Sequence, residues 1–294
     1  MILLLTGADA PPHPFPMAEV VSRIAEEFRV PSSALMVRSC QQLPRVAQFG
    51  RLEQRRAEQE IRRCARWLCE DLAEASDHVP KGPFVLSELR FAEIDEAQAT
   101  PLLNRLHYLR TTRSDSTHFA LVDPVSRLPV ALCSLSGLQW PRLVQKLEGR
   151  FGVAPAEILD ISRVFAVDTA PANSISTLLS RVRTWVRHHR RDVTLLSTVV
   201  DPNLGFTGSS YRAANWQRWM TIRARPYVYY RGRFMTTRQL REQFGTSNFG
   251  ELKLRNPRAF EKSRLPLEDS LLFCCRIRGA TESIPPSQVA RLHR

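Results

Sequence analysis

The sequence predicts an α/β fold in which a mixed central sheet is covered by helices on both faces. Two strand-like runs, at 119–123 and 128–135, flank a turn and form a β-hairpin pattern. Strand and helix patterns then alternate between 158 and 200. The chain has 294 residues, of which 43% are hydrophobic and 24% charged, enough for one large domain or two small ones. This composition excludes a disordered chain and a membrane-embedded one.

The first 85 residues are expected to form a helical region. Apolar residues recur at helical spacing between 17 and 29, where Pro31 ends the pattern, and again in a longer helix at about 52–75. We interpret the arginines of the longer helix as a solvated face. A stretch with proline and glycine at 78–83 indicates a linker, so the first domain is placed at 1–85.

The elements after this linker are predicted in alternating order. They are a strand at 85–91, a helix ending near 106–108, the hairpin around 124–127, a strand at 158–167, a helix at 171–190, a strand at 193–200, a short helix at 211–216, and strands at 221–225 and 227–231. These elements define a sheet domain at 86–235. The remaining residues, 236–294, are expected to form a basic C-terminal extension.

Basic side chains are in excess and unevenly placed. The chain has 42 Lys+Arg against 29 Asp+Glu, a net charge of +13 and a pI near 10.2, and only four of the basic residues are lysine. Residues 202–294 hold 17 basic and 6 acidic side chains, a net charge of +11. The planar guanidinium group of arginine binds two phosphate oxygens at once, which the ammonium group of lysine does less well. We therefore expect a nucleic acid, DNA or RNA, bound by the C-terminal third.

Targeting and cysteine patterns give no sign of secretion. The apolar run at 1–5 is too short for a membrane span and lacks the basic flank and cleavage site of a signal peptide. A cytoplasmic location without a membrane partner is the expectation. The six cysteines form no Cys-x-x-Cys pair with histidines at zinc spacing, so neither a disulfide framework nor a zinc ribbon is indicated, and no metal ligand is assigned.

Asp201 begins the densest group of candidate catalytic residues. It follows directly on an apolar strand, and ligands of open α/β sheets gather at the carboxyl ends of strands. A carboxylate there can orient an amine and accept its proton. Tyr211, ten residues further on, is a candidate acid or stacking surface. The alternative, that Asp201 only shapes a turn and Gly208 only starts a helix, stays open.

A second candidate site lies at the start of the helix at 171–190. Asn173, Ser174 and Ser176 offer hydroxyls and free backbone N–H groups to a phosphate or pyrophosphate. No glycine-rich loop is present, so neither a P-loop nor a Rossmann fingerprint is assigned. The alternative is an N-cap that serves only its own helix.

Arginines alternate with aromatic residues between positions 216 and 234. This pattern suits phosphate contact combined with base stacking, and we expect roughly half of the rings to be buried in the core. The candidate nucleic-acid residues are Asn215, Trp216, Arg223, Arg225, Tyr227, Arg231 and Arg233.

Several of these motifs together resemble the Mom family of phage DNA-modification proteins. The resemblance covers about 86–250 and rests on His107-Tyr-Leu, on 161–168, on 171–176, on Asp201 and on the Thr-Gly-Ser-Ser-Tyr-Arg-Ala-Ala-Asn-Trp run at 207–216. A run related to this last one occurs in proteins of Druantia anti-phage systems. The residues before 85 and after 250 have no recognised counterpart.

The resemblance implies a GNAT-like acyltransferase fold and conversion of adenine in DNA to its N6-carbamoylmethyl form. It implies that Arg163, with Asn173, Ser174 and Ser176, receives the pyrophosphate of an acyl-CoA, although the glycine-rich loop typical of GNAT enzymes is missing. Asp201 and Tyr211 then lie on the substrate side. His107 and Tyr108 face them.

The sequence is therefore interpreted as a DNA-modifying transferase that attaches a small acyl-derived group to a nucleobase amine. One alternative is a GNAT-type transferase acting on RNA or on a small-molecule amine. Another is a non-catalytic DNA-binding component of a defence system. Whether iron takes part and whether the chain forms an oligomer stay open.

Overall fold

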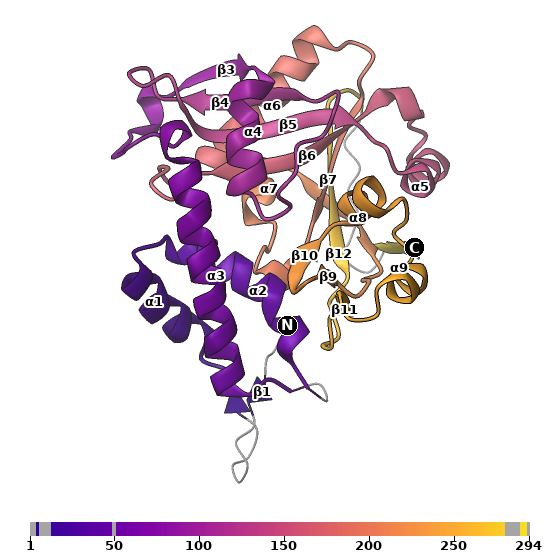
Figure 1. Ribbon diagram of the computed structural model, residues 1–294. Coiled ribbons are helices and arrows are strands. Elements are labelled where there is room, and N and C mark those ends of the chain that lie inside the picture. Colours follow the sequence, from indigo (N-terminus) through magenta and orange to yellow (C-terminus); the bar gives the residue numbers. More distant parts are fainter. Residues whose placement is uncertain (1–3, 6–12, 49–50, 280–288, 293–294) are drawn as a thin grey trace. The chain divides into compact units, whose positions relative to one another are not determined.

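The computed structural model describes residues 4–5, 13–48, 51–279 and 289–292 and separates into two compact units (Figure 1). Unit 1 comprises Met1–Glu74, Pro202–Gly205 and Ala224–Glu268, and unit 2 comprises Ala75–Asp201, Phe206–Arg223 and Asp269–Arg294. This division differs from the three consecutive domains expected at 1–85, 86–235 and 236–294. The reason is that contacts far apart in the chain join residues 224–268 to the N-terminal helices.

Unit 1 begins with three helices around a shared apolar core. They are α1 (Met17–Phe28), α2 (Ser32–Val46) and α3 (Gln54–Glu74). The predicted helices at 17–29 and 52–75 are confirmed as α1 and α3, whereas α2 was missed. Pro31 does end the first pattern, but it also stands as the N-cap of α2. The core includes Ile24 and Leu35, both fully buried.

The later part of unit 1 is a small antiparallel sheet with two helices. Strand β9 (Val228–Tyr230) pairs with both β10 (Arg233–Met235) and β11 (Phe260–Lys262). Helices α8 (Thr237–Phe244) and α9 (Phe249–Arg255) lie between β10 and β11 in the chain. The buried Tyr229 hydroxyl donates to the Gln41 carbonyl of α2 at 2.8 Å. This bond ties the small sheet to the N-terminal helices. A further short pair, β1 (Leu4–Leu5) with β2 (His13–Pro14), is antiparallel.

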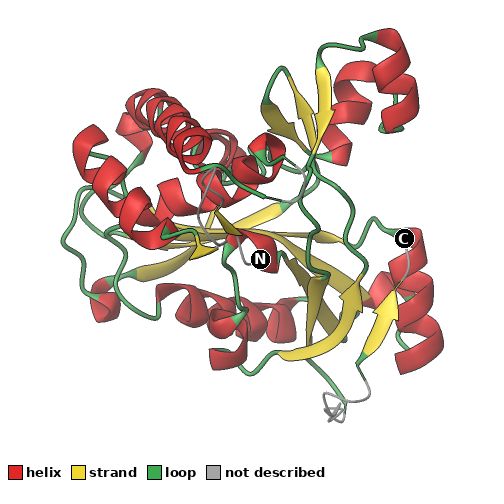
Figure 2. Ribbon diagram, turned by 90° about the horizontal axis from the view of Figure 1, so that it is seen from below, coloured by secondary structure: helices red, strands yellow, loops and turns green. Residues whose placement is uncertain are grey.

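Unit 2 contains an eight-stranded mixed sheet within the described residues. Its order is β13-β8-β12-β7-β6-β5-β4-β3. The strands are β3 (Arg90–Ile94), β4 (Thr117–Val122), β5 (Pro129–Gly137), β6 (Ile158–Ala166), β7 (Leu195–Val200), β8 (Gln217–Ile222), β12 (Ser270–Arg276) and β13 (Ala290–Leu292). Neighbours are antiparallel except for β6 with β7 and β8 with β13. Figure 2 shows the strands turning progressively along the sheet, as twisted sheets do.

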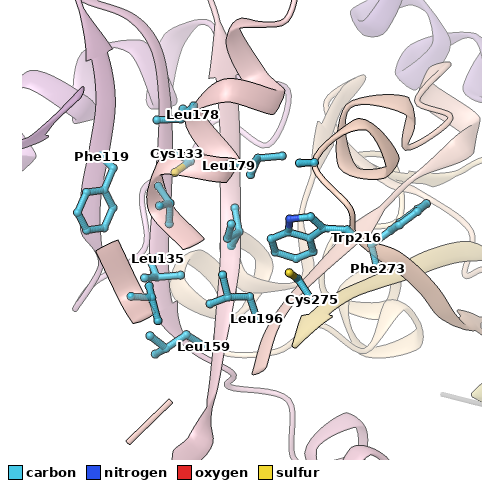
Figure 3. Close-up of a cluster of buried hydrophobic side chains, with 14 of the residues drawn as sticks. Phe119, Cys133, Leu135, Leu159, Leu178, Leu179, Leu196, Trp216, Phe273 and Cys275 are labelled. Atoms are coloured by element: carbon cyan, nitrogen blue, oxygen red, sulfur yellow. The ribbon is translucent and has the colours of Figure 1, made fainter. Parts of the chain in front are cut away.

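Helices cover both faces of this sheet. They are α4 (Glu96–Arg105), α5 (Pro141–Phe151), α6 (Ser174–His189) and α7 (Ser209–Ala213). Successive side chains of a strand point to opposite faces. On β4, Phe119 packs in the cluster that includes α6, whereas Ala120 packs in the cluster that includes α4 (Figure 3 shows the α6 side). The predicted α/β class, with a mixed sheet between two helical layers, is confirmed.

Two predicted strands are displaced. The run at 85–91 forms a 3-10 turn at Leu86–Glu88 before β3 starts at Arg90, because Leu86 and Leu89 pack against the core from this turn. The run at 221–225 belongs instead to a strand that begins at Gln217 and ends at Ile222, where pairing with β12 stops. The predicted hairpin, the helix at 171–190 and the strand at 193–200 are confirmed as β4–β5, α6 and β7.

Candidate functional site

The two central parallel strands of unit 2 pair over a short distance and then separate. Strands β6 and β7 are in register only from Ile158–Leu195 to Asp160–Ser197. Beyond these pairs, β6 stays with β5 up to Ala166, and β7 stays with β12. The carboxyl ends of β6 and β7 therefore lie apart, and α/β folds place their ligands at such strand ends.

Tyr211 of α7 reaches this region from the α6 side of the sheet. Its hydroxyl lies 3.5 Å from the Thr198 hydroxyl, which donates to the Ile161 carbonyl at 2.9 Å. Thr198 of β7 is thus hydrogen-bonded to Ile161 of β6, and the Tyr211 hydroxyl lies next to the Thr198 hydroxyl. Burial raises the pKa of Tyr211 well above its ordinary value, and the nearby Tyr108 adds to the rise. The phenol consequently keeps its proton at neutral pH.

His107 and Tyr108 follow α4. Their rings lie 4.4 Å apart, and the Tyr108 ring lies 5.4 Å from that of Phe206. Burial raises the pKa of Tyr108 to about 12, and the Asp201 carboxylate contributes to this rise. Tyr108 therefore lies within electrostatic range of both Asp201 and Tyr211.

His107 serves a positioning function. It is 4% exposed, and its Nδ1 accepts the backbone N–H of Leu109 at 3.2 Å. Burial and the Arg163 charge lower the pKa of His107 well below its ordinary value, against a hydrogen bond to the Val164 backbone. The imidazole is therefore neutral and occupied in holding the loop that carries Tyr108.

Beside this site lies a groove at the start of α6, which we call the serine groove. Its volume is about 320 Å³, and its lining includes Asn173, Ser174, Ser176, Ser209, Ser210 and Ala213. The groove joins the start of α6 to α7, so the segments at 173–176 and 209–213 meet although the sequence separates them.

The first turn of α6 points hydrogen-bond donors toward this groove. Asn173 has a left-handed φ of 67° and does not cap the helix with its side chain. The hydroxyls of Ser174 and Ser176 donate to the carbonyls of Pro171 and Asn173. In the described part of the chain, the backbone N–H groups of Ile175 and Ser176 meet no acceptor. Free N–H groups at a helix start suit a phosphate.

Arg163 does not belong to the serine groove, which corrects its assignment as a pyrophosphate ligand. Its Nε donates to the Thr111 carbonyl at 2.9 Å, and one Nη donates to the Thr111 hydroxyl at 2.7 Å. The side chain is 9% exposed. The strand carries Arg163 on the opposite face from Val164, which packs with the α6 cluster, so its guanidinium faces the 107–113 loop.

The sequence interpretation missed a buried ion pair on the same face of the sheet. Arg113 donates to Asp160 at 3.0 Å, and the Ser197 hydroxyl donates to the other carboxylate oxygen at 3.1 Å. Burial raises the pKa of Asp160, which Arg113 opposes. Asp160 is a lone carboxylate in an apolar strand pattern, and this was the one signal that could have identified it.

The predicted nucleic-acid residues are divided between the two units. Asn215, Trp216 and Arg223 belong to unit 2, whereas Arg225, Tyr227, Arg231 and Arg233 belong to unit 1. Within unit 1, Arg63 and Arg233 both lie over the Trp67 ring, at 4.7 and 4.6 Å from its centroid. The N-terminal helices therefore share this basic region with the later segment.

Trp216 is a core residue, which corrects its assignment as a stacking surface. It is 2% exposed and packs with Phe273 and Cys275 (Figure 3). Asn215 is exposed, with a left-handed φ of 62° in the turn that ends α7. Of the rings in the basic stretch, Trp216, Trp219 and Tyr229 are buried, and Tyr227, Tyr230 and Phe234 are half-buried, which confirms the expected balance.

Among the residues that the structure describes, no helix is both long and apolar enough to cross a bilayer. Likewise, no group of three or more His, Cys, Asp or Glu side chains in that part is arranged to hold a metal ion.

The sequence matches the model of the Mom protein family over residues 88–263, more than half of the chain. The chain belongs to the Mom protein family. No curated protein matches it. Similar solved structures include Arabidopsis thaliana NAA60 in complex with acetyl-CoA, at 12% identity, covering 65% of this chain and 99% of that one, with a TM-score of 0.38. Ribosomal-protein-S5-alanine acetyltransferase from Vibrio fischeri is similar at 11% identity, covering 67% and 97%, also with a TM-score of 0.38.

Proposed function

We propose that this protein transfers a small acyl group from an acyl-CoA-like donor to a nucleobase amine of DNA, with adenine N6 as the favoured acceptor. The observation that carries the proposal is the family match at 88–263, which spans both the serine groove and the Asp201 site. Family membership supports DNA modification, and the groove beside the tyrosines supports a bound donor.

The residues of the serine groove fit the pyrophosphate of a coenzyme A. The N–H groups of Ile175 and Ser176 and the hydroxyls of Ser209 and Ser210 would hold its oxygens. Such a donor supplies a thioester, whose carbonyl carbon is open to attack by an amine. In this proposal, backbone N–H groups take the place of Arg163, whose guanidinium is bonded to Thr111.

The acceptor amine needs help because the lone pair of an adenine N6 is delocalised into the ring. Asp201, at the end of β7, would orient the amine and accept its proton as the new N–C bond forms and the C–S bond breaks. Tyr211 and Tyr108 carry their protons at neutral pH, as an ordinary tyrosine does, and burial raises their pKa values further. Either phenol can therefore donate to the carbonyl oxygen or to the leaving thiolate.

An amine inside duplex DNA is out of reach of such a site. The base would have to leave the stack, at a cost of roughly a few kcal/mol. The half-buried rings of Tyr108 and Phe206, 5.4 Å apart, are positioned to offset part of this cost by contact with the extruded base.

Mass spectrometry of nucleosides from DNA incubated with the protein and acyl-CoA tests the proposal. Asp201→Asn keeps the size of the side chain and removes its charge, so modification should fall by about 100-fold or more. Asp115→Asn is the matched control, because Asp115 is an exposed carboxylate of unit 2 whose left-handed φ of 58° asparagine also adopts.

Three outcomes would contradict the proposal. Parental modification by a folded Asp201→Asn protein would return Asp201 to the role of a turn residue. Transfer to RNA or to a small amine, with DNA left unmodified, would favour the first alternative function. DNA binding by a protein that modifies no amine would favour the non-catalytic component of a defence system.

A further inference from the structure

A second hollow of unit 2 shares α7 with the serine groove, and we call it the arginine pocket. Its volume is about 360 Å³. It is lined by Arg183 of α6, Arg212 of α7, Arg276 of β12, and Trp216, Gln217 and Trp219 at the start of β8. Four elements therefore converge on this pocket.

The charge in the arginine pocket has one sign. Three guanidinium groups line it, and none of the described lining residues is a carboxylate. Burial raises the pKa of the Cys275 thiol, which the neighbouring Arg183 opposes, so the thiol stays neutral.

Buried polar atoms without partners gather at the same place. The indole nitrogens of Trp216 and Trp219, and the side-chain oxygen of Gln217, have no hydrogen-bond partner among the described residues. The two tryptophans are 2% and 1% exposed. Buried donors are normally paired, so two unpaired indole N–H groups in a cationic pocket indicate that an acceptor binds there. The Gln217 oxygen needs a donor, which a water molecule at the rim of the pocket can supply.

Two of the arginines are held in place before any ligand arrives. Arg276 donates to the Phe151 carbonyl at 2.9 Å and lies over the Trp219 ring, 5.8 Å from its centroid. Arg212 donates to the Thr207 carbonyl at 2.8 Å. A guanidinium has five N–H donors, so the bond to Thr207 leaves further donors of Arg212 for a ligand. Fixed arginine forks match the oxygens of a phosphate.

We propose that the arginine pocket binds a phosphate group, and that this phosphate belongs to the backbone of the DNA substrate. The second half of this proposal rests on the proposed function. Tyr211 and Arg212 are successive residues of α7, so a strand whose base reaches Tyr211 brings its own phosphates to the neighbourhood of Arg212. Arg212 and Asn215 are exposed, which leaves the pocket open to a macromolecule.

The test is the salt dependence of binding to a labelled 20-base-pair DNA duplex. Each neutralised phosphate contributes roughly 0.9 to the slope of log K against log salt. The double variant Arg183→Gln with Arg212→Gln should weaken binding about tenfold at 0.1 M salt and make the slope shallower by about one. Arg181→Gln with Arg187→Gln is the matched control, since both are exposed arginines of α6 outside the pocket.

Trp219→Phe is a second test variant, and it leaves the net charge of the protein unchanged. It keeps an aromatic ring in the core and removes the N–H donor, so binding should weaken severalfold with the salt slope nearly unchanged. Inorganic phosphate and pyrophosphate, added at constant ionic strength, should compete with DNA for the parent protein and less for the double variant.

Parental affinity and slope in the folded double variant would overturn the pocket as a phosphate site. If the double variant loses phosphate competition but binds DNA as the parent does, the bound phosphate does not come from the DNA backbone. The pocket would then be assigned to a small phosphate ester. Stronger binding of an RNA duplex than of DNA would overturn the choice of DNA. A protein that shows the expected slopes but modifies no nucleoside would contradict the proposed function and support the pocket.

Discussion

The serine groove and the arginine pocket are hollows of similar size, about 320 and 360 Å³, that share the five-residue helix α7 but recognise ligands by different means. Ser209, Ser210 and Ala213 face the groove, whereas Arg212 faces the pocket. The groove offers backbone N–H groups and hydroxyls with no charged side chain in its described lining. The pocket offers three guanidinium groups.

In the proposed function, one short helix separates the sites of two anionic ligands. Backbone N–H groups at a helix start are fixed dipoles that select by geometry and close approach. Arginines act through full charge, so a DNA phosphate bound to them is strongly sensitive to salt. A donor held in the groove and a DNA strand held at the pocket can thus be distinguished by variants that affect one and leave the other unchanged.

The largest expected effect comes from a substitution that displaces α7, because this helix lines both the serine groove and the arginine pocket. Gly208 precedes α7 with a φ of +75°, and a Cβ there would lie 2.4 Å from the Phe273 ring. Gly208→Ala should therefore shift α7 and lower the free energy of unfolding by roughly 2–4 kcal/mol, measured in urea.

Gly205→Ala is its control. Gly205 has a similar φ of +86°, but nothing lies within 4 Å of the added Cβ. Only backbone strain remains, at a cost of roughly 1–2 kcal/mol. Equal losses for both variants would mean that Phe273 yields without moving α7.

A smaller effect is expected from a substitution in the serine groove alone, which should change acetyl-CoA binding and leave DNA binding unchanged. Ser176→Glu adds a carboxylate to the first turn of α6, where it favours the helix but repels a pyrophosphate. Acetyl-CoA affinity, measured by calorimetric titration, should fall at least tenfold, while the salt slope of DNA binding stays parental.

Thr177→Glu, one residue further along α6 and outside the lining of the groove, is the matched control and should bind acetyl-CoA as the parent does. If Ser176→Glu instead weakens DNA binding and spares acetyl-CoA, the assignment of the two hollows is reversed.

The smallest effect concerns pH. The pKa of His107 is lowered in the folded state, so below about pH 6.5 the unfolded state takes up its proton first. The free energy of unfolding should then fall as pH falls, by at most about 1.4 kcal/mol per pH unit from this residue. Arginines do not titrate in this range, so DNA binding by the folded protein should hardly change.

Unfolding in urea at pH 7.5 and 5.5 measures this contribution. His107→Gln should reduce the dependence on pH, and His188→Gln, an exposed residue of α6, should leave it parental. An identical dependence in parent and His107→Gln would show that another group carries it.

The local patterns of the sequence were sufficient for several elements of the site. Apolar alternation predicted the β4–β5 hairpin and the strand that ends before Asp201, and the serines at 174–176 marked the start of α6. The run at 207–216 carried the family resemblance, which the match at 88–263 confirms. Such features depend on neighbours within one turn or one strand, so the sequence contains them directly.

Features that depend on distant pairing could not be read in this way. Residues 224–268 were placed with the sheet domain and a separate extension, whereas Tyr229 bonds to Gln41 across 188 positions and joins unit 1. Trp216 was expected to stack on a base and is buried instead, because Phe273 and Cys275 of β12 pack against it. Neighbouring strands decide whether an aromatic ring is exposed or buried. The sequence around the ring does not identify those strands.

The sequence by itself determined the α/β class, the family, the position of Asp201 at a strand end and the donors at the start of α6. Only the tertiary structure decided that Arg163 binds Thr111, that Arg113 pairs with Asp160, and that Arg183, Arg212 and Arg276 meet in one pocket. The physical reason is that a side chain's period along the chain sets the face on which it lies, whereas the groups it meets there come from other strands and helices, brought together by long-range packing.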